Sequence, residues 1–221
     1  MHPWLEPLCD QFKAHRCEAN AKAVRAYMKD IAPFFGLKTP LRRQLLKEHI
    51  ATFGMPRVDE LPDVVRSAYA CEEREMHYVA MDLLVKVAKK LGPEHLPLLE
   101  ELITTHSWWD TVDAYAANVV GVILKKHPQT IGDWNERWIR SSDMWLNRTA
   151  ILFQLKWKQD TDEEMLFSNC AQHAAHSDFF IRKAIGWALR AYAETAPEAV
   201  QAFVATHTLS PLSKREALRK L

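Results

Sequence analysis

The sequence predicts an all-α protein, built as a solenoid of about six two-helix repeats. Three observations support this fold class. The chain contains only six glycines and almost no strand-like alternation of polar and apolar residues. Apolar residues recur at steps of three and four, which is the spacing of one helix face. Similar segments also follow one another at a constant spacing of 35 residues, as expected for helical repeats.

The helices are marked by their starts, their periodicity and their ends. Thr39-Pro40 and Ser210-Pro211 each place a capping residue before a proline, a combination that favours the first turn of a helix. Apolar periodicity is clearest in two segments, residues 75–90 and 178–194. Prolines mark helix ends at three points, residues 91–93, 126–128 and 195–197. We therefore expect about a dozen helices.

The 35-residue period is carried by three serines that each precede a bulky apolar segment. These are Ser107 in SWWDTVD, Ser142 in SDMWLNR and Ser177 in SDFFIRK. We expect each serine to cap the second helix of its repeat, and SWWD has the shape of a capping box. The residue six places after each serine then occupies the same point on three neighbouring helices; these residues are Asp113, Arg148 and Lys183.

Two tryptophans extend this row of charged residues. Trp109 lies four residues before Asp113, and Trp187 lies four residues after Lys183, so each shares a helix face with its neighbour. In one interpretation the tryptophans are core residues and Asp113 is a buried ion-pair partner of Arg148. In the other, the row lines a concave functional surface, because burying three charges is costly even when they are paired. The residues alone leave both interpretations open.

Composition limits the function further. Hydrophobic residues make up 48% of the chain, which excludes a disordered protein. No apolar run is long enough for a membrane helix, and the N-terminus lacks a signal-peptide pattern, so we expect a cytoplasmic protein. Four scattered cysteines without a CxxC pair argue against a zinc or iron–sulfur site. The net charge of +1 demands no nucleic-acid partner, although basic clusters occur at residues 155–158, 181–184 and 213–220.

The row of charged and aromatic residues supports only a few kinds of chemistry. The sequence contains no GxSxG, no HExxH and no phosphate-binding glycine loop. A carboxylate flanked by aromatic rings suits the stabilisation of a sugar cation, since glycosidic cleavage passes through an oxocarbenium-like transition state. Arginine suits a phosphate group.

Five long motifs resemble the AlkD-like bacterial DNA alkylation repair family, the HEAT-like-repeat DNA glycosylases. They are TPLRRQLLK, LEELITTHSWWDTVD, RTAILFQLKWKQ, FFIRKAIGWALR and LSPLSKREA, and the resemblance covers essentially the whole chain. It implies one domain over residues 1–221, a right-handed superhelix of HEAT-like repeats whose concave face binds double-stranded DNA. It also implies a bacterial, nucleoid-associated monomer that uses neither a cofactor nor a metal.

The resemblance further implies base excision repair of alkylation damage. The expected activity is a monofunctional glycosylase that hydrolyses the N-glycosidic bond of cationic N3- and N7-alkylated purines, such as 3-methyladenine and 7-methylguanine, without a base-extrusion pocket. Asp113 would stabilise the sugar cation and position water. Trp109 and Trp187 would pack against the sugar and backbone of the lesion, and Arg148 would bind an adjacent phosphate.

Further DNA contacts are expected from the basic clusters and from helix N-termini, which favour phosphates. Tyr27 is included on the resemblance alone, and core packing is the equal alternative for it. For each cation the alternative is a solvated surface charge. The complete set is Tyr27, Thr39, Arg43, Lys156, Lys158, Lys183, Ser213, Lys214 and Arg215.

Two alternatives remain at this level. Helical repeats are scaffolds far more often than enzymes, so a non-catalytic module that binds DNA or protein is the main one. A binding module, however, has no reason to keep an acid opposite a phosphate. A helix-hairpin-helix glycosylase is disfavoured, because the sequence has neither a glycine-rich hairpin between helices nor a four-cysteine cluster.

Overall fold

The computed structural model describes all 221 residues and contains helices but no strands, which confirms the predicted all-α class. The chain divides into two compact units, Met1–Leu91 and Gly92–Leu221. The prediction of a single domain over residues 1–221 stays a prediction. No helix is both long and apolar enough to cross a membrane.

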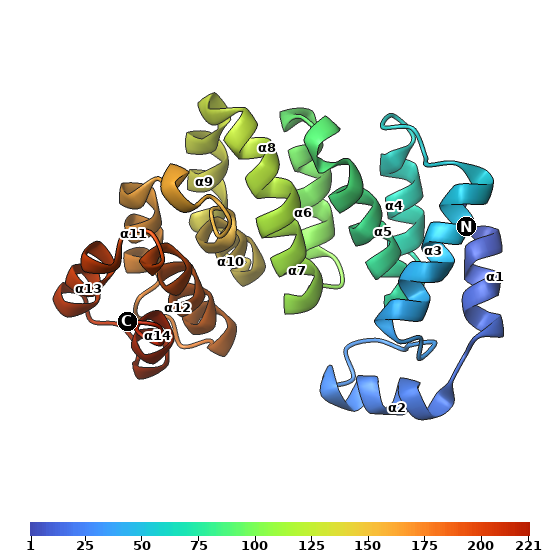
Figure 1. Ribbon diagram of the computed structural model, residues 1–221, viewed down its shortest axis with the longest axis horizontal. Coiled ribbons are helices and arrows are strands. Elements are labelled where there is room, and N and C mark those ends of the chain that lie inside the picture. The colour runs from blue at the N-terminus through green and yellow to red at the C-terminus, as the bar shows by residue number, and fades with distance from the viewer. The chain divides into compact units, whose positions relative to one another are not determined.

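The first unit contains five helices (Figure 1). They are α1 (Glu6–Ala14), α2 (Glu18–Tyr27), α3 (Thr39–Phe53), α4 (Leu61–Tyr69) and α5 (Arg74–Val87), with a 3-10 turn at Ala88–Lys90. α4 packs on α5 and α1 packs on α3, which gives two helix pairs. α2 lies apart from these pairs (Figure 1). Only Ala21 of this helix is buried for that reason.

The buried carboxylate of Glu75 holds the segment that connects α2 to α3. It accepts hydrogen bonds from the backbone amides of Phe35, Gly36 and Leu37 at 2.8–3.1 Å. Gly36 has a φ of 87°, and a Cβ there would lie 2.2 Å from the carbonyl oxygen of Cys17. Only glycine therefore permits this close approach of the two backbone segments.

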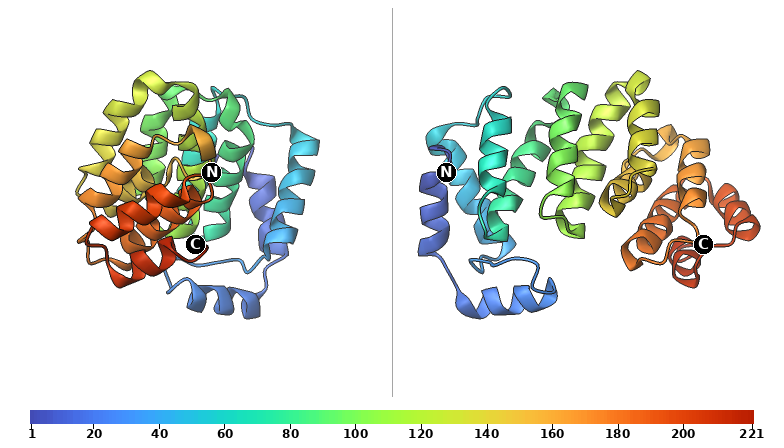
Figure 2. Two further views of the ribbon diagram at one scale, coloured as in Figure 1. Left: turned by 60° about the vertical axis from the view of Figure 1, so that its left-hand side comes forward. Right: turned by 180° about the vertical axis from the view of Figure 1, so that it is seen from behind.

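The helices of the second unit follow one another in chain order (Figures 1 and 2). Its helices are α6 (Leu96–Thr104), α7 (Trp109–Tyr115), α8 (Gly121–Lys126), α9 (Ile131–Ile139), α10 (Met144–Leu152), α11 (Glu163–Gln172), α12 (Phe179–Ala193), α13 (Pro197–Thr206) and α14 (Pro211–Ala217). Short 3-10 turns occur at Pro93–His95, Pro128–Thr130 and Lys158–Asp160. α7, α10 and α12 begin 35 residues apart, as the sequence period predicted.

α7 and α8 are joined by a π-helical turn over Ala116–Val120, so helical structure runs without a break from Trp109 to Lys126. No pattern in the sequence predicts this turn. A π turn leaves a carbonyl without its usual helical partner, and here the side-chain amide of Asn118 donates to the carbonyl of Ala114 at 2.9 Å. Gly121, directly after the turn, lets the helix approach the end of α10, because a Cβ there would lie 2.1 Å from the carbonyl oxygen of Phe153.

The predicted serine caps are wrong. The Ser107 hydroxyl donates to the carbonyl of Ile103 at the end of α6, and Trp108 occupies the N-cap position of α7 without a side-chain cap. The true caps of α10 and α12 are Asp143 and Asp178, one residue after each serine, whose carboxylates accept backbone amides of the first turn. Aspartate caps more effectively here because its charge also favours the helix N-terminus.

The two helix starts predicted at Thr39-Pro40 and Ser210-Pro211 differ from each other. Ser210 is a true cap, and its hydroxyl accepts the amide of Ser213 at 3.0 Å. Thr39 is instead the first helical residue of α3, and Lys38 occupies the N-cap position without a side-chain cap. The prediction of a cap at Thr39 is therefore wrong by one residue.

Candidate functional site

The candidate site begins with Asp113, which lies on the last turn of α7 before the π turn. Its neighbours Val112 and Tyr115 are fully buried and fix the helix in the core of the second unit. The Asp113 side chain remains 20% exposed. The helix therefore holds this carboxylate at the edge of the core, where one side packs against protein and the other faces solvent.

Arg148 on α10 binds Asp113 through two parallel hydrogen bonds. Nε donates to Oδ1 at 2.6 Å and Nη2 donates to Oδ2 at 2.8 Å. The guanidinium is buried, with only 1% of the side chain exposed. A fork of this kind fixes both the position and the plane of the carboxylate. The alignment of these residues by the 35-residue period thus corresponds to a direct contact.

The remaining groups of Arg148 are also engaged. Nη1 donates to the backbone carbonyl of Phe180, and the guanidinium carbon lies 5.3 Å from the centroid of the Trp187 ring. A phosphate contact from Arg148, expected from the resemblance, does not fit this arrangement. The side chain is buried and each of its three nitrogens already donates a hydrogen bond within the protein, so its place in the site is to hold Asp113. The interpretation of the two residues as a buried ion pair therefore describes this contact better.

The electrostatic environment of Asp113 contains opposing effects. Burial raises the pKa of the Asp113 carboxyl above its ordinary value, the hydrogen bonds and charge of Arg148 act to lower it, and the charge of Asp110 raises it. The pKa remains raised overall, because the low-polarity surroundings disfavour the charged form more than one arginine compensates. A perturbed carboxyl in a partly open position is typical of a functional site.

Trp187, on α12, has cations near its ring. The Arg148 guanidinium carbon lies 5.3 Å and the Lys183 ammonium 5.2 Å from the ring centroid, both within the range of cation–π attraction. Trp187 is half-buried, as is Trp109 at the first position of α7. All five residues of the predicted row therefore belong to α7, α10 and α12, and α10 packs on both other helices.

An aromatic cluster supports the row from the N-terminal ends of these helices. The Trp108 ring lies 5.9 Å from that of Trp145 and 5.0 Å from that of Phe180, while Trp145 and Phe180 are 5.1 Å apart. Trp108 thus packs against the aromatic rings of α10 and α12. Its indole nitrogen is buried and has no hydrogen-bond partner in the structure.

The structure also contains an acid that the sequence analysis did not identify. Glu216 on α14 binds Lys183 at 3.1 Å and Arg190 at 2.8 Å. It lies within SKREALRK, which reads as a basic cluster, and its separation from Lys183 does not match the 35-residue period. No pattern in the sequence therefore pointed to it.

Apart from Lys183, which is half-buried, the expected DNA contacts of the second unit fall into two groups. Lys156, Lys158, Lys214 and Arg215 are exposed. Ser213, by contrast, is fully buried: its hydroxyl donates to the carbonyl of Arg182 at 2.9 Å, and its amide donates to Ser210. Ser213 therefore joins α14 to α12 and has no group left for a phosphate in this arrangement.

In the first unit the three expected DNA contacts are all exposed. Tyr27 ends α2 and is 70% exposed, Thr39 begins α3, and Arg43 lies one turn further along α3. Arg43 is 3.7 Å from the carboxylate of Asp82, which also binds the buried Arg42 at 2.6 Å.

A groove runs past the open side of Trp187. Its walls come from the end of α12, from the loop after α10 and from the C-terminal residues, and four of its eight lining residues are cations. The lining residues are Leu155, Lys156, Lys158, Trp187, Arg190, Ala191, Glu194 and Lys220. Lys156 donates a 2.5 Å hydrogen bond to Asn118 of the π turn, so this turn holds one cation of the groove.

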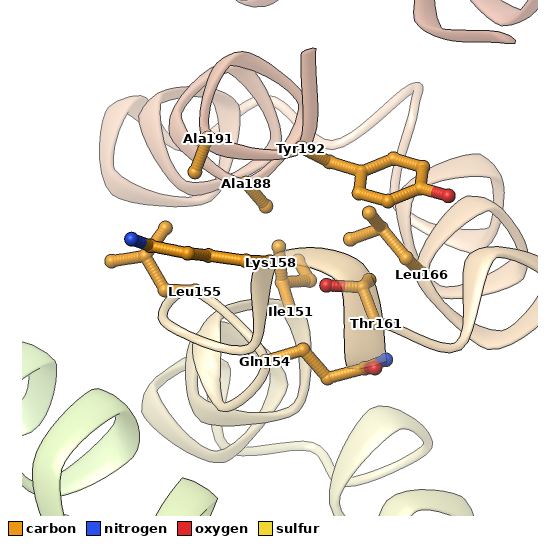
Figure 3. A pocket seen from close by; sticks show the side chains of 9 residues that line it. All are labelled: Ile151, Gln154, Leu155, Lys158, Thr161, Leu166, Ala188, Ala191 and Tyr192. Carbon is orange, nitrogen blue, oxygen red and sulfur yellow. The ribbon is translucent and has the colours of Figure 1, made fainter. Parts of the chain in front are cut away.

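A second, much smaller cavity lies between α12 and the residues that follow α10 (Figure 3). Its volume is only about 10 Å³, which is enough for about one water molecule and excludes a nucleobase. No group of three or more His, Cys, Asp or Glu side chains is placed to hold a metal ion.

Fold and site together define a helical-repeat protein that fixes one partly exposed carboxylate against a buried arginine, and this arginine lies beside a tryptophan ring. Residues 8–221 match the family described as DNA alkylation repair enzyme, and the chain belongs to this family. The resemblance inferred from the sequence motifs is thereby confirmed.

Two solved structures extend the comparison. A predicted DNA alkylation repair enzyme from Enterococcus faecalis has 28% sequence identity and a TM-score of 0.87; the match covers 94% of this chain and 97% of that one. The protein smu.31 from Streptococcus mutans UA159 has 16% identity and a TM-score of 0.62, covering 82% and 96% of the two chains, and shares the fold. These matches confirm the helical-repeat fold. No curated protein matches the chain.

Proposed function

We propose that this member of the DNA alkylation repair family is a glycosylase acting on cationic N3- and N7-alkylated purines in double-stranded DNA. The observation that carries the proposal is the geometry of Asp113, a carboxylate that is still 20% exposed and is fixed by two hydrogen bonds from the buried Arg148, which itself lies against the Trp187 ring. A fixed carboxylate at a dry but accessible edge suits a positive charge that develops during a reaction.

The substrate class follows from what the site supplies. A purine alkylated at N3 or N7 is already positively charged and leaves as a neutral base, so it needs no general acid. The demanding step is stabilisation of the oxocarbenium-like sugar, for which a carboxylate is suited. Neutral damaged bases such as uracil would require a proton donor at the base, and nothing in the row of Trp109, Asp113, Arg148, Lys183 and Trp187 is assigned to that role.

In the proposed mechanism Asp113 faces C1′ of the deoxyribose and accepts a hydrogen bond from the attacking water. Each carboxylate oxygen can accept more than one hydrogen bond, so binding to Arg148 leaves capacity for water. Arg148 keeps the carboxylate in the plane required for this attack. The bond from C1′ to the base nitrogen breaks with its electron pair going to the base, the water oxygen bonds to C1′, and its proton passes to solvent through Asp113.

Trp109 and Trp187 are assigned to the lesion's sugar and backbone. Their half-buried rings can exclude bulk water from one side of Asp113, which strengthens its attraction for a cation. We propose that the base itself stays outside a dedicated pocket, and the groove beside Trp187 supports this because cations, and not base-reading amides, dominate its lining. Bulky alkyl groups would then be tolerated.

DNA binding is assigned to exposed cations and helix ends. The proposed contacts are Lys156, Lys158, Lys214 and Arg215 in the second unit, and Tyr27, Thr39 and Arg43 in the first. Lys183 contributes positive charge near Trp187. Affinity that rests on such contacts falls steeply with salt, and a flat salt dependence would contradict this assignment.

The test is incubation of the protein with duplex DNA that contains N7-methylguanine, with free base measured by chromatography. We expect release by the wild type and a loss of about 100-fold or more in Asp113→Asn, because one preorganised electrostatic group contributes about this much. Asp82→Asn is the matched control, since Asp82 is also bound to a buried arginine, and its release rate should stay within about threefold. Equal rates in wild type and Asp113→Asn would refute the assignment, as would efficient excision of uracil.

Circular dichroism must show that both variants are folded. Borohydride treatment with DNA containing an abasic site distinguishes water from an amine nucleophile. A monofunctional glycosylase forms no covalent adduct, whereas a trapped adduct would identify a lysine, with Lys183 the first to examine.

A further inference from the structure

The C-terminal helix α14 is fastened to the part of α12 that carries Trp187. Gly186, directly before Trp187, permits the contact, because a Cβ at this position would lie 2.4 Å from Cβ of Glu216. The Ser213 hydroxyl adds a hydrogen bond of 2.9 Å to the carbonyl of Arg182. The close approach of α14 thus coincides with the turn of α12 that presents the tryptophan.

Glu216 is placed at the centre of this contact. Its Oε1 lies 3.1 Å from Nζ of Lys183, and its Oε2 lies 2.8 Å from Nη1 of Arg190. Lys183 comes one turn before Trp187 on α12 and Arg190 one turn after, so both cations flank the ring along the helix. One carboxylate therefore links the two cations that border this tryptophan.

The Glu216 carboxylate is only 10% exposed, so its charge is partly removed from water. Burial acts to raise the pKa of Glu216, but the hydrogen bonds and charges of Lys183 and Arg190 outweigh it and leave the pKa below its ordinary value. Glu216 is consequently ionised at neutral pH, and it offsets one of the two positive charges of Lys183 and Arg190.

An acid at this position opposes the binding of a polyanion. Arg190 lines the groove beside Trp187, and Lys183 lies 5.2 Å from the ring centroid, so a phosphate that approaches either cation must compete with Glu216. A simple binding surface would gain affinity from a neutral residue here. Affinity for DNA therefore does not explain an acid at position 216. The fixed placement of Lys183, Arg190 and the Trp187 ring does explain it.

We infer that Glu216 is a positioning residue for the reaction, which keeps Lys183 and Arg190 on either side of Trp187 and so orders the ring against the lesion, at the expense of affinity for undamaged DNA. The inference rests on the proposed glycosylase function. It assigns to α14 a part in the chemistry, although Glu216 itself does not touch the reacting atoms.

The test compares Glu216→Gln with wild type in two measurements. Affinity for undamaged duplex is measured by fluorescence anisotropy over a range of salt, and excision of N7-methylguanine under single-turnover conditions with saturating protein. We expect Glu216→Gln to bind undamaged DNA about three- to tenfold more tightly, with a salt dependence steeper by about one to two phosphate contacts. We expect its excision rate constant to fall about tenfold, because misplacing a positioning group costs rate more than binding.

Glu100→Gln is the matched control. Glu100 of α6 is a part-buried acid that also pairs with an arginine, Arg137, at 2.6 Å, but neither residue lines the groove or belongs to the row. The affinity of this variant for undamaged DNA and its excision rate should both stay unchanged. Glu216→Asp keeps the charge with a shorter reach, and it should restore wild-type affinity for undamaged DNA and part of the rate.

The outcomes separate the possibilities. Loss of both affinity and rate with a lowered melting temperature, not repaired in Glu216→Asp, would overturn the inference in favour of a purely structural role. An unchanged rate constant in a folded Glu216→Gln would also overturn it. If the wild type releases no base at all, the proposed function fails; tighter and more salt-dependent binding by Glu216→Gln would still support competition between Glu216 and phosphate, and unchanged binding would refute that as well.

Discussion

Each unit of the protein contains a buried arginine bound to an aspartate beside an aromatic ring. In the first unit Arg42 of α3 binds Asp82 of α5 at 2.6 Å and lies 5.1 Å from the ring centroid of Tyr78. In the second unit Arg148 binds Asp113 and lies 5.3 Å from the ring centroid of Trp187. The two arrangements use the same kinds of residues, yet they differ in how the arginine and the acid are matched.

Asp113 is held at both oxygens by one arginine, so this ion pair is formally neutral. Asp82 receives one hydrogen bond from Arg42 and has a second arginine, the 63% exposed Arg43, at 3.7 Å, so this cluster carries an excess positive charge. A positive cluster suits a phosphate, whereas a carboxylate that is balanced by only one arginine suits a cationic sugar. The number of arginines per acid thus separates a proposed binding position from a proposed reaction site.

The largest difference between the two pairs is expected on replacing arginine by lysine. Arg148→Lys removes the two-point grip on Asp113 and should lower the excision rate about 30-fold, because lysine cannot reproduce the planar fork. It should also lower the free energy of unfolding by about 2–3 kcal/mol, since one buried charge loses part of its compensation. Single-turnover kinetics and urea unfolding measure the two effects.

Arg42→Lys is the counterpart in the first unit, where only one hydrogen bond joins arginine and acid. We expect its excision rate to stay within about threefold of wild type. Similar losses of rate in both variants would mean that the comparison does not distinguish a reaction site from a structural pair.

A second expected difference is the pH dependence of excision. Asp113 acts as a carboxylate, and its pKa is raised by burial against the opposing effect of Arg148. Activity is therefore present above this pKa and is lost as the pH falls through it, at a pH above the ordinary aspartate value of about 4. The single-turnover rate constant measured against pH should show this one acid limb, and Asp82→Asn should leave its midpoint in place.

The same shift has a consequence for stability with the opposite sign. A carboxyl whose pKa is raised by folding binds its proton more tightly in the folded state, so its contribution to stability is greatest at low pH and declines as the pH rises through the folded pKa. If activity were lost only at or below pH 4, without any change in fold, the effect of Arg148 on the pKa of Asp113 would be larger than the effect of burial.

How much of this the sequence could predict is clearest along the 35-residue period. The period predicted the starts of α7, α10 and α12 and aligned Asp113 with Arg148, because stacked repeats bring equivalent positions into contact. The period could not show that Arg148 is buried, since the same alignment fits a solvated row. The burial of the Arg148 side chain depends on the packing around Phe180, whose carbonyl accepts a hydrogen bond from Arg148.

Features that break the repeat were not predictable in this way. The π turn over Ala116–Val120 depends on tertiary contacts, among them the approach of Gly121 to the end of α10. Glu216 pairs with residues that lie outside the repeat register, and Ser107 precedes the cap position by one residue, which residue type alone does not reveal. Local propensity and periodicity carry no information about such long-range or off-register contacts.

A smaller effect is expected where the π turn supports a cation. Asn118 donates a hydrogen bond from its side-chain amide to the carbonyl of Ala114, and its side-chain oxygen accepts one from Lys156. Asn118→Ala should cost about 1 kcal/mol of stability, as one net hydrogen bond does, and weaken duplex binding about threefold, because Lys156 loses its fixed position in the groove. Thermal unfolding and anisotropy measure these effects. Unchanged affinity would mean that Lys156 does not contact DNA or needs no positioning.

The smallest effect is expected at Arg43, the exposed arginine of the first-unit cluster. Arg43→Gln removes one cation but leaves the buried pair of Arg42 and Asp82 in place, so folding should be unaffected. If Arg43 contacts one phosphate, affinity for any duplex falls two- to fivefold and the salt slope decreases by about one. The excision rate at saturating protein stays constant, because the loss concerns binding shared by damaged and undamaged DNA. A reduced rate constant at saturation would place Arg43 with Asp113 in the chemical step, and the distinction between the two clusters would then rest on affinity alone.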